Sequence, residues 1–100
     1  MLTSTAMIAF KNFFLGQIAF ASYKVNGTYY ETPIEPRIFA DGRVAFSFTI
    51  GDTPPGDITV TEVRLHDHNG VVFAAKTENI IRQGSIAGIN YQFLFSLSET

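Results

Sequence analysis

The fold class is decided by one stretch of the sequence: Ile58-Thr59-Val60-Thr61-Glu62-Val63-Arg64-Leu65-His66-Asp67-His68-Asn69-Gly70-Val71-Val72-Phe73-Ala74-Ala75. It contains two runs rich in alternating apolar residues, separated by Asn-Gly, and this pattern is the strongest short-range signal for a β-hairpin. We therefore predict a long strand, a tight turn at Asn69-Gly70 and a returning strand. The stretch holds no catalytic arrangement, which indicates a rigid β module that acts through its surfaces.

The first strand of this hairpin changes its alternation midway. Ile58 and Val60 share one face, whereas Val63 and Leu65 continue that face from odd-numbered positions. One extra residue near Thr61-Glu62, a β-bulge, would keep all four side chains in the core.

The register of the returning strand depends on the length of the turn. A two-residue turn pairs His66 with Phe73. A three-residue loop with a left-handed glycine pairs Leu65 with Phe73 and Val63 with Ala75. We favour the second register because it places apolar residues opposite each other.

Beyond the hairpin, residues 77–89 are polar and contain glycine, which favours a crossing loop with room for one helical turn. The last strand alternates clearly, with Tyr91, Phe93, Phe95 and Leu97 on one face.

Before the hairpin, Asn26-Gly27 is a second turn signal. It joins a covered strand at 18–24 to a return strand through Tyr29 and Tyr30. The return strand should end at Thr32, because Pro33 has no amide hydrogen to donate.

A third turn signal, Asp41-Gly42, leads into a strand at 44–50 with one wet face. The preceding residues 33–36 are expected to form an extended edge or a loop. The following residues 51–57 are rich in proline and glycine and should form a surface loop.

The N-terminal residues 4–15 are predicted to form a helix. Apolar residues recur there at helical spacing, Thr3 or Ser4 can cap the N-terminus, and Gly16 is placed to serve as a left-handed C-terminal cap. Phenylalanine lowers helix propensity, so a strand is the alternative. Residues 1–100 then form a single domain that is mainly β: an antiparallel β-sandwich with a short N-terminal α-helix.

The composition indicates a surface that a partner covers. Charged residues make up 16% and aromatic residues 14% of the 100 residues, with ten Phe and no Trp. A chain so poor in charge has more apolar surface than one small core hides, so we expect a homo-oligomer. A densely aromatic monomer core is the alternative.

Other partner classes are disfavoured. The net charge is −2 and no basic patch stands out, so we expect no nucleic-acid groove. No apolar run is long enough for a membrane span, and the N-terminal segment lacks the basic start of a secretory signal. The chain has no Cys, which excludes disulfides and thiol nucleophiles.

Few residues suggest chemistry. His66 and His68, the only histidines, share a face of a strand and could ligate a metal, but two polar residues at an exposed hairpin tip are the favoured interpretation. Asp52 and Asp57 are better explained as turn formers than as Ca²⁺ ligands. No nucleophile–base arrangement is present, so we expect neither an enzyme nor a cofactor.

The aromatic residues are the main candidates for contact with a partner. Three tyrosines cluster around the Asn26-Gly27 turn, where exposed rings can stack on sugars or anchor a protein; ordinary cross-strand packing is the alternative. The full set of interface or ligand candidates is Phe10, Phe13, Phe14, Tyr23, Tyr29, Tyr30, His66 and His68.

The segment 60–70 resembles the I-T-E-(I/V)-x-L-(F/Y)-D-x-x-G stretch in N-terminal domains of bacteriophage tail-fibre and tail-collar proteins. The opening Leu2-Thr3 before a short helix and strand, Ala74-Ala75-Lys76 after the turn, and the closing strand from Tyr91 are also similar. His66 departs from the aromatic residue usual there, and the chain stops where a fibre protein would continue into a stalk. The resemblance implies a small virion component, made in the host cytoplasm, or a fibre attachment domain standing alone.

These observations predict a non-enzymatic structural protein of a phage tail or related contractile particle. It would attach to copies of itself and to tail or baseplate proteins. The alternative is a carbohydrate-binding β-sandwich that binds glycans through Tyr23, Tyr29 and Tyr30.

Overall fold

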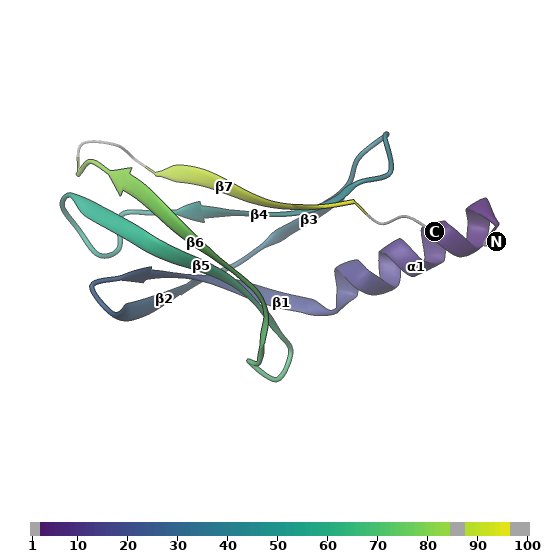
Figure 1. Ribbon diagram of the computed structural model, residues 1–100, viewed down its shortest axis with the longest axis horizontal. Coiled ribbons are helices and arrows are strands. Elements are labelled where there is room, and N and C mark those ends of the chain that lie inside the picture. The colour runs from purple at the N-terminus through teal and green to yellow at the C-terminus, as the bar shows by residue number, and fades with distance from the viewer. Residues whose placement is uncertain (1–2, 85–87, 97–100) are drawn as a thin grey trace.

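Two antiparallel sheets face each other in the computed structural model, which describes residues 3–84 and 88–96 (Figure 1). One sheet has four strands in the order β2-β1-β5-β6, and the other has three in the order β3-β4-β7. The predicted fold class, mainly β with an N-terminal helix and a sandwich-like arrangement, is confirmed. In chain order the elements are α1 (Ser4–Gly16), β1 (Ile18–Val25), β2 (Thr28–Thr32), β3 (Glu35–Ile38), β4 (Val44–Ile50), β5 (Ile58–Asp67), β6 (Val72–Arg82) and β7 (Ile89–Phe95).

The core lies between the two sheets and follows the alternation of their central strands. β4 contributes Phe46, Phe48 and Ile50, all buried. β5 contributes the four residues whose phase change was noted in the sequence, and all four are buried: Ile58, Val60, Val63 and Leu65. The pairing of β5 with β6 is irregular at the predicted place, where it advances by two residues from Val60 to Glu62 and by three from Ile80 to Thr77. The register therefore places the extra residue on β6, whereas the prediction placed it on β5.

The tip of the β5–β6 hairpin has the predicted three-residue loop. The Asp67 amide donates to the Val71 carbonyl, and Gly70 is left-handed with φ +81°. The predicted register beyond the loop is wrong by one residue. His66 pairs with Val72 and Leu65 with Ala74, so Phe73 is an extra residue on β6.

A contact outside the hairpin explains this shift. The Phe73 ring lies 5.7 Å from the Phe14 ring of α1, measured between centroids. A pairing rule that considers only the two strands cannot anticipate a contact with a third element. Because of the bulge, Val63 pairs with Lys76 rather than with Ala75.

The prediction of a crossing loop over residues 77–89 is wrong for its first part. β6 continues to Arg82, with Val60 opposite Ile80 and Ile58 opposite Arg82. Thr77 and Asn79 lie on the exposed side of this edge strand, and pairing with β5 outweighs the loop-like composition of the segment. Residues 85–87 lie outside the described residues.

The other turns agree with the sequence. Asn26 and Gly27 both have positive φ, at 51° and 83°, which is the geometry of a tight hairpin turn between β1 and β2. Gly42 is left-handed at the turn between β3 and β4, with φ +91°. β3, which carries Pro36, is an edge strand as expected.

The surrounding segments need small corrections. The alternation of the strand at 44–50 puts Ala45, with Ser47 and Thr49, on its predicted wet face, but Ala45 is fully buried. β7 ends at Phe95, and Leu97 lies outside the described residues.

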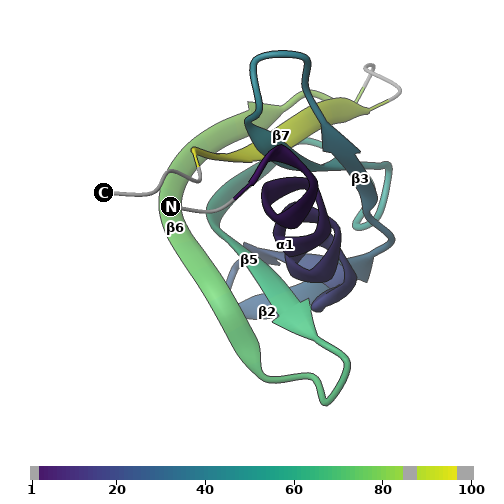
Figure 2. The same cartoon turned by 90° about the vertical axis from the view of Figure 1, so that its right-hand side faces the viewer.

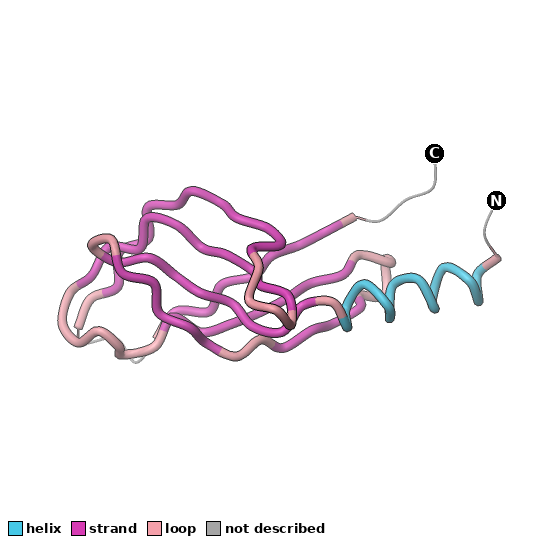
Figure 3. The backbone as a smooth tube through the Cα atoms, turned by 90° about the horizontal axis from the view of Figure 1, so that it is seen from below, coloured by secondary structure: helices cyan, strands magenta, loops and turns pink. Residues whose placement is uncertain are grey.

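α1 extends beyond the end of the strands along the long axis of the molecule (Figures 1 and 3). The side chain of Thr3 caps its first turn by accepting from the Ala6 amide at 3.0 Å. Gly16 is the last helical residue and is not left-handed, so the predicted C-terminal cap is wrong. The chain instead leaves the helix through Gln17 in right-handed geometry and enters β1 directly.

Candidate functional site

The surface of α1 is the most unusual feature of the described molecule. None of its 13 residues is buried, although apolar residues point to almost every side and Lys11 is its only charge. Ile8, Phe10 and Phe13 are 57%, 51% and 57% exposed. A helix that is apolar all round is normally buried, so this helix has the sequence of a covered element and the position of an uncovered one. We call the surface formed by Ile8, Phe10 and Phe13 the helix surface.

Phe14 attaches the base of α1 to the sandwich. Its ring lies 5.6 Å from Phe46, 5.7 Å from Phe73 and 5.3 Å from Phe95, between centroids. The contacts with Phe46 and Phe95 are edge-to-face, an arrangement that is favourable beyond simple burial. Of the three phenylalanines named as interface candidates, Phe14 therefore holds the helix, whereas Phe10 and Phe13 are free for a partner.

The two histidines hold the junction between α1 and the β5–β6 hairpin. The His68 Nε2 donates to the Gly16 carbonyl at 2.7 Å, which satisfies one of the last carbonyls of the helix. The His66 Nδ1 donates to the Gly70 carbonyl at 3.1 Å, its Nε2 lies 2.7 Å from Ser22 Oγ, and its ring stacks on Phe20. Because a carbonyl only accepts, Nδ1 of His66 carries a proton, and in the neutral ring Nε2 then accepts from Ser22.

These hydrogen bonds leave the histidines poorly disposed to bind a metal. Both ring nitrogens of His66 are occupied, and His68 is turned toward the helix end. Among the described residues, no group of three or more His, Cys, Asp or Glu side chains is arranged to hold a metal ion.

The three tyrosines named as ligand candidates do not form one open platform. Tyr23 is buried in the core, and its hydroxyl donates to the Thr53 carbonyl. Burial raises the pKa of the Tyr23 hydroxyl above its ordinary value. Tyr30 stacks on Tyr23 with centroids 5.8 Å apart, so this pair is cross-strand packing.

Tyr29 belongs to a separate polar cluster on the outer face of the four-stranded sheet. Its hydroxyl donates to Glu62 at 2.9 Å, and the Arg64 guanidinium lies 4.2 Å from its ring centroid. The hydrogen bonds from Arg64 and then from Tyr29 lower the pKa of the Glu62 carboxyl below its ordinary value. The cluster ties β2 to β5 through side chains that extend across β1.

Arg82 is a buried charged residue that the sequence did not single out. It is 1% exposed, and its guanidinium donates to the carbonyls of Gly51, Pro54 and Gly56. The Tyr23 hydroxyl binds a fourth carbonyl of the same loop. This buried cation holds the 51–57 loop against the core, and no signal in the sequence separates it from the other arginines.

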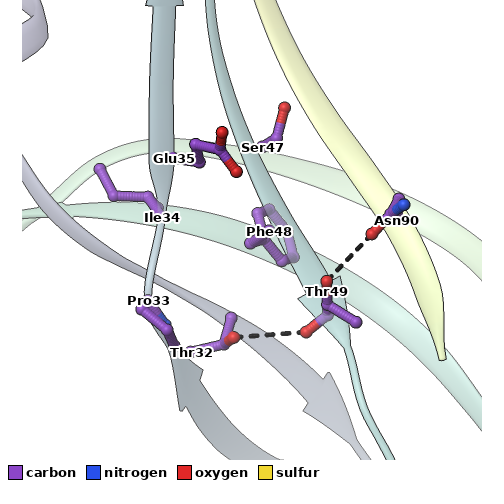
Figure 4. A pocket seen from close by; sticks show the side chains of 8 residues that line it. All are labelled: Thr32, Pro33, Ile34, Glu35, Ser47, Phe48, Thr49 and Asn90. Atoms are coloured by element: carbon purple, nitrogen blue, oxygen red, sulfur yellow. Dashed lines mark hydrogen bonds between the residues drawn. The ribbon is translucent and has the colours of Figure 1, made fainter. Parts of the chain in front are cut away.

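A shallow hollow lies where the chain passes from one sheet to the other (Figure 4). Its volume is about 260 Å³, and its lining is Thr32, Pro33, Ile34, Glu35, Ser47, Phe48, Thr49 and Asn90. The Thr49 hydroxyl donates to the Asn90 side-chain carbonyl at 2.9 Å, and Thr32 donates to the Thr49 carbonyl. Glu35 is the only carboxylate in this lining and no histidine joins it, so these described residues do not form an acid–base pair.

A second hollow adjoins it over the exposed face of the three-stranded sheet. Its volume is about 410 Å³. Its lining is Glu35, Arg37, Ser47, Asn90, Tyr91 and Gln92. The side chains are mostly planar and polar, which is the chemistry that binds hydroxyl groups rather than apolar ligands.

No helix in the described part of the chain has the length and apolar character needed to cross a membrane. Comparisons of the chain with protein families, with curated proteins and with solved structures found no match. The resemblance to tail-fibre domains therefore rests on the residues quoted for it in the sequence.

Proposed function

We propose that this chain is a non-enzymatic structural protein that attaches to copies of itself and to a larger assembly through α1. The single observation that carries the proposal is the helix surface, where Ile8, Phe10 and Phe13 are more than half exposed on a helix without a buried residue. Water is an unfavourable environment for these side chains, and a second protein surface is a favourable one.

The overall dimensions are larger than those of a compact domain, which supports a projecting element that is available for attachment. The radius of gyration is 15.2 Å, whereas a compact domain of this length has about 13 Å. The accessible surface is 6220 Å², against about 5,700 Å² for a compact monomer of the same mass. The projecting helix visible in Figure 1 is the element that departs from a compact outline.

Covering the helix surface with a partner contributes a moderate free energy of association. Fully burying one large apolar side chain contributes about 1.5–3 kcal/mol. The three side chains are already about half covered in the folded chain, so completing their burial contributes about 2–4 kcal/mol per helix. This amount favours association when two or more helices, or a helix and a preformed groove, meet.

The setting we propose is a phage tail or related contractile particle. It is supported by the resemblance of the 60–70 segment and by the order of the elements around it. Its test is the composition of purified particles from the source of the gene, where the chain should sediment with the particles and the flanking genes should encode tail or baseplate proteins. Absence from the particles and flanking genes for unrelated enzymes would contradict this setting.

The attachment itself is tested by removing the apolar character of the helix surface. In the triple variant Ile8→Gln, Phe10→Gln, Phe13→Gln, the chain should stay folded, because none of these side chains is buried. We expect light scattering to show an oligomer or precipitate for the natural chain and a lower association state for the variant.

The matched control is Thr5→Gln with Asn12→Gln, two exposed polar positions of the same helix. It should associate like the natural chain. A natural chain that stays a soluble monomer at high concentration, or a triple variant that associates as strongly as the natural chain, would refute the attachment role of α1.

Carbohydrate binding is the second candidate, and the polar hollow of about 410 Å³ supports it better than the tyrosines do. Asn90 and Gln92 offer planar amides beside Glu35 and Arg37. If a glycan binds there, Asn90→Ala with Gln92→Ala should abolish the signal on a glycan array and Tyr29→Ala should leave it. If Tyr29→Ala abolished the signal and the double variant kept it, the sugar site would lie at the tyrosines instead.

A further inference from the structure

β6 presents a long open edge. It lies at one margin of the four-stranded sheet, and within the described residues no strand pairs with its outer side (Figure 2). With 11 residues it is longer than any other strand the structure describes. An open edge carries unpaired backbone N–H and C=O groups that can bind another strand.

Two of the other margins, β2 and β3, are better protected against such pairing. Edge strands are usually short or interrupted by proline. β2 has five residues, and β3 has four, including Pro36. β7, the remaining margin, has seven residues and, like β6, contains neither proline nor glycine. β6 pairs irregularly with β5 at two places, but it is the longest edge among the described strands.

We propose that β6 pairs antiparallel with β6 of a second copy of this chain, around a two-fold axis at Thr77. The inference deepens the proposed function, because it names a self-association surface separate from α1, and it rests on that function only in treating the chain as self-associating. Isologous pairing about a two-fold axis is the commonest way in which identical chains associate.

Charge selects this register. With Thr77 opposite itself, Lys76 lies opposite Glu78 of the second copy, and Glu78 lies opposite its Lys76. Within one chain the two side chains already form an ion pair, with Nζ 3.6 Å from Oε2. Moving the axis to either neighbouring residue would place Lys76 opposite Lys76 or Glu78 opposite Glu78, and like charges directly opposite each other are destabilising.

The apolar residues agree with the same register. Phe73 is 45% and Ile81 is 64% exposed, and the axis at Thr77 places each of them opposite the other in the second copy. Aromatic and β-branched residues form favourable cross-strand pairs. By symmetry one such pair lies at each end of the ladder. Because Phe73 is the extra residue of the bulge and its ring contacts Phe14, only the exposed part of that ring takes part in the pair.

The two faces of β6 stay distinct beyond the bulge at Phe73, from Ala74 to Arg82, which the pairing requires. The odd-numbered residues from Phe73 to Ile81 are all exposed. Of the even-numbered residues, Ala74, Glu78, Ile80 and Arg82 are partly or fully buried. Because opposite residues in the proposed register have the same parity, exposed side chains meet exposed side chains.

The first experiment exchanges the charges. Lys76→Glu alone places two acidic pairs across the axis, and Glu78→Lys alone places two basic pairs there, so sedimentation velocity should show dimer dissociation constants raised about tenfold or more for each. Glu78→Lys also removes the acceptor of the Tyr91 hydroxyl, so the mixture of the two variants is the decisive sample. The equimolar mixture should restore a dimer.

Two results would overturn the proposal. One is a mixture that associates no better than its components. The other is a pair of single variants that dimerise like the natural chain.

The second experiment uses the absence of cysteine from the chain. We place a single cysteine at the axis by Thr77→Cys in the helix-surface triple variant, so that α1 does not contribute to association. Residues opposite each other across an antiparallel pair come within disulfide reach. Under mild oxidation the Thr77→Cys chain should form a covalent dimer much faster than a Thr28→Cys control, which carries its cysteine at the exposed start of β2 on the other edge of the sheet.

Equal cross-linking rates for the two cysteine variants would refute pairing of β6. If that happened while association still depended on Ile8, Phe10 and Phe13, the inference about β6 would fail and the proposed function of α1 would stand. If cross-linking succeeded while the triple substitution left the association of the chain unchanged, the inference about β6 would stand and the proposed function of α1 would fail.

Discussion

Replacing Arg82 by methionine should loosen the 51–57 loop and destabilise the whole domain. Methionine retains most of the apolar stem but cannot donate to the carbonyls of Gly51, Pro54 and Gly56, which all accept from the guanidinium. The substitution therefore separates the hydrogen bonds of Arg82 from its packing at the end of β6.

The size of the effect follows from opposing contributions. A hydrogen bond from a charged donor contributes about 1.5–3 kcal/mol, so three such bonds sum to about 4.5–9 kcal/mol. Removing the guanidinium also removes the cost of burying its charge, which is several kcal/mol. Water can reach the freed carbonyls because most of the loop is exposed. We expect a net loss of about 2–4 kcal/mol, a large part of the 5–15 kcal/mol typical of a domain.

Urea unfolding measures this loss directly. With a slope near 2 kcal/mol per M, the midpoint should fall by roughly 1–2 M. Amide hydrogen exchange in the 51–57 loop should accelerate more than exchange in β4. The control is Arg37→Met, an exposed position on β3, which should change stability by less than about 0.5 kcal/mol. If Arg82→Met fell within that same range, the guanidinium would not be what holds the loop.

Three further predictions concern stability. Phe14→Ala should lower the free energy of unfolding by about 2–3 kcal/mol and unfold α1, because a lone helix of this length is marginal in water. Circular dichroism should show loss of helix with the sheets retained. Unchanged helicity would refute the role of Phe14 in holding the helix. Gly70→Ala should destabilise the domain by about 1–2 kcal/mol because the φ of Gly70 is +81°, whereas Gly16→Ala should stabilise it by about 0.4–1 kcal/mol. The added methyl group meets open space at both sites, so the backbone conformation alone distinguishes them. Equal effects of the two substitutions in thermal melts would contradict this. Because the pKa of Glu62 is lowered, its contribution to the free energy of unfolding is present above the ordinary carboxyl pKa and is lost as pH falls toward the folded-state pKa. Glu62→Gln should therefore flatten the decline of the unfolding free energy below about pH 5. An unchanged slope would argue against this role of Glu62.

The parts of the fold that the sequence predicted are those fixed by local rules. Asn26-Gly27 and Asn69-Gly70 mark turns because left-handed geometry is needed there. The alternation of β4 and the phase change of β5 identify the core-facing residues correctly, since side-chain direction follows directly from strand geometry.

The parts that the sequence could not predict depend on contacts between distant elements. Phe73 is displaced from its expected pair by the ring of Phe14. Arg82 lies in a polar segment that is typical of a loop, and its role becomes visible only once β5 pairs with β6 and brings it beneath the 51–57 loop. Tyr23 was named as a ligand candidate with cross-strand packing as the alternative, and the structure places it in the core with its hydroxyl bound to that same loop.

The two proposed surfaces meet at one point, and this determines how they must be tested. Phe73 belongs to the open edge of β6 and also touches Phe14 at the base of α1. A substitution at Phe73 would disturb helix anchoring and strand pairing together and could not distinguish them. Lys76, Thr77 and Glu78 lie further along the strand, beyond the contact of Phe73 with Phe14, whereas Ile8, Phe10 and Phe13 are exposed on α1 itself. Substitutions at these two sets of positions therefore separate attachment through the helix from pairing through the sheet, although both draw on the surplus of apolar surface that the composition predicts.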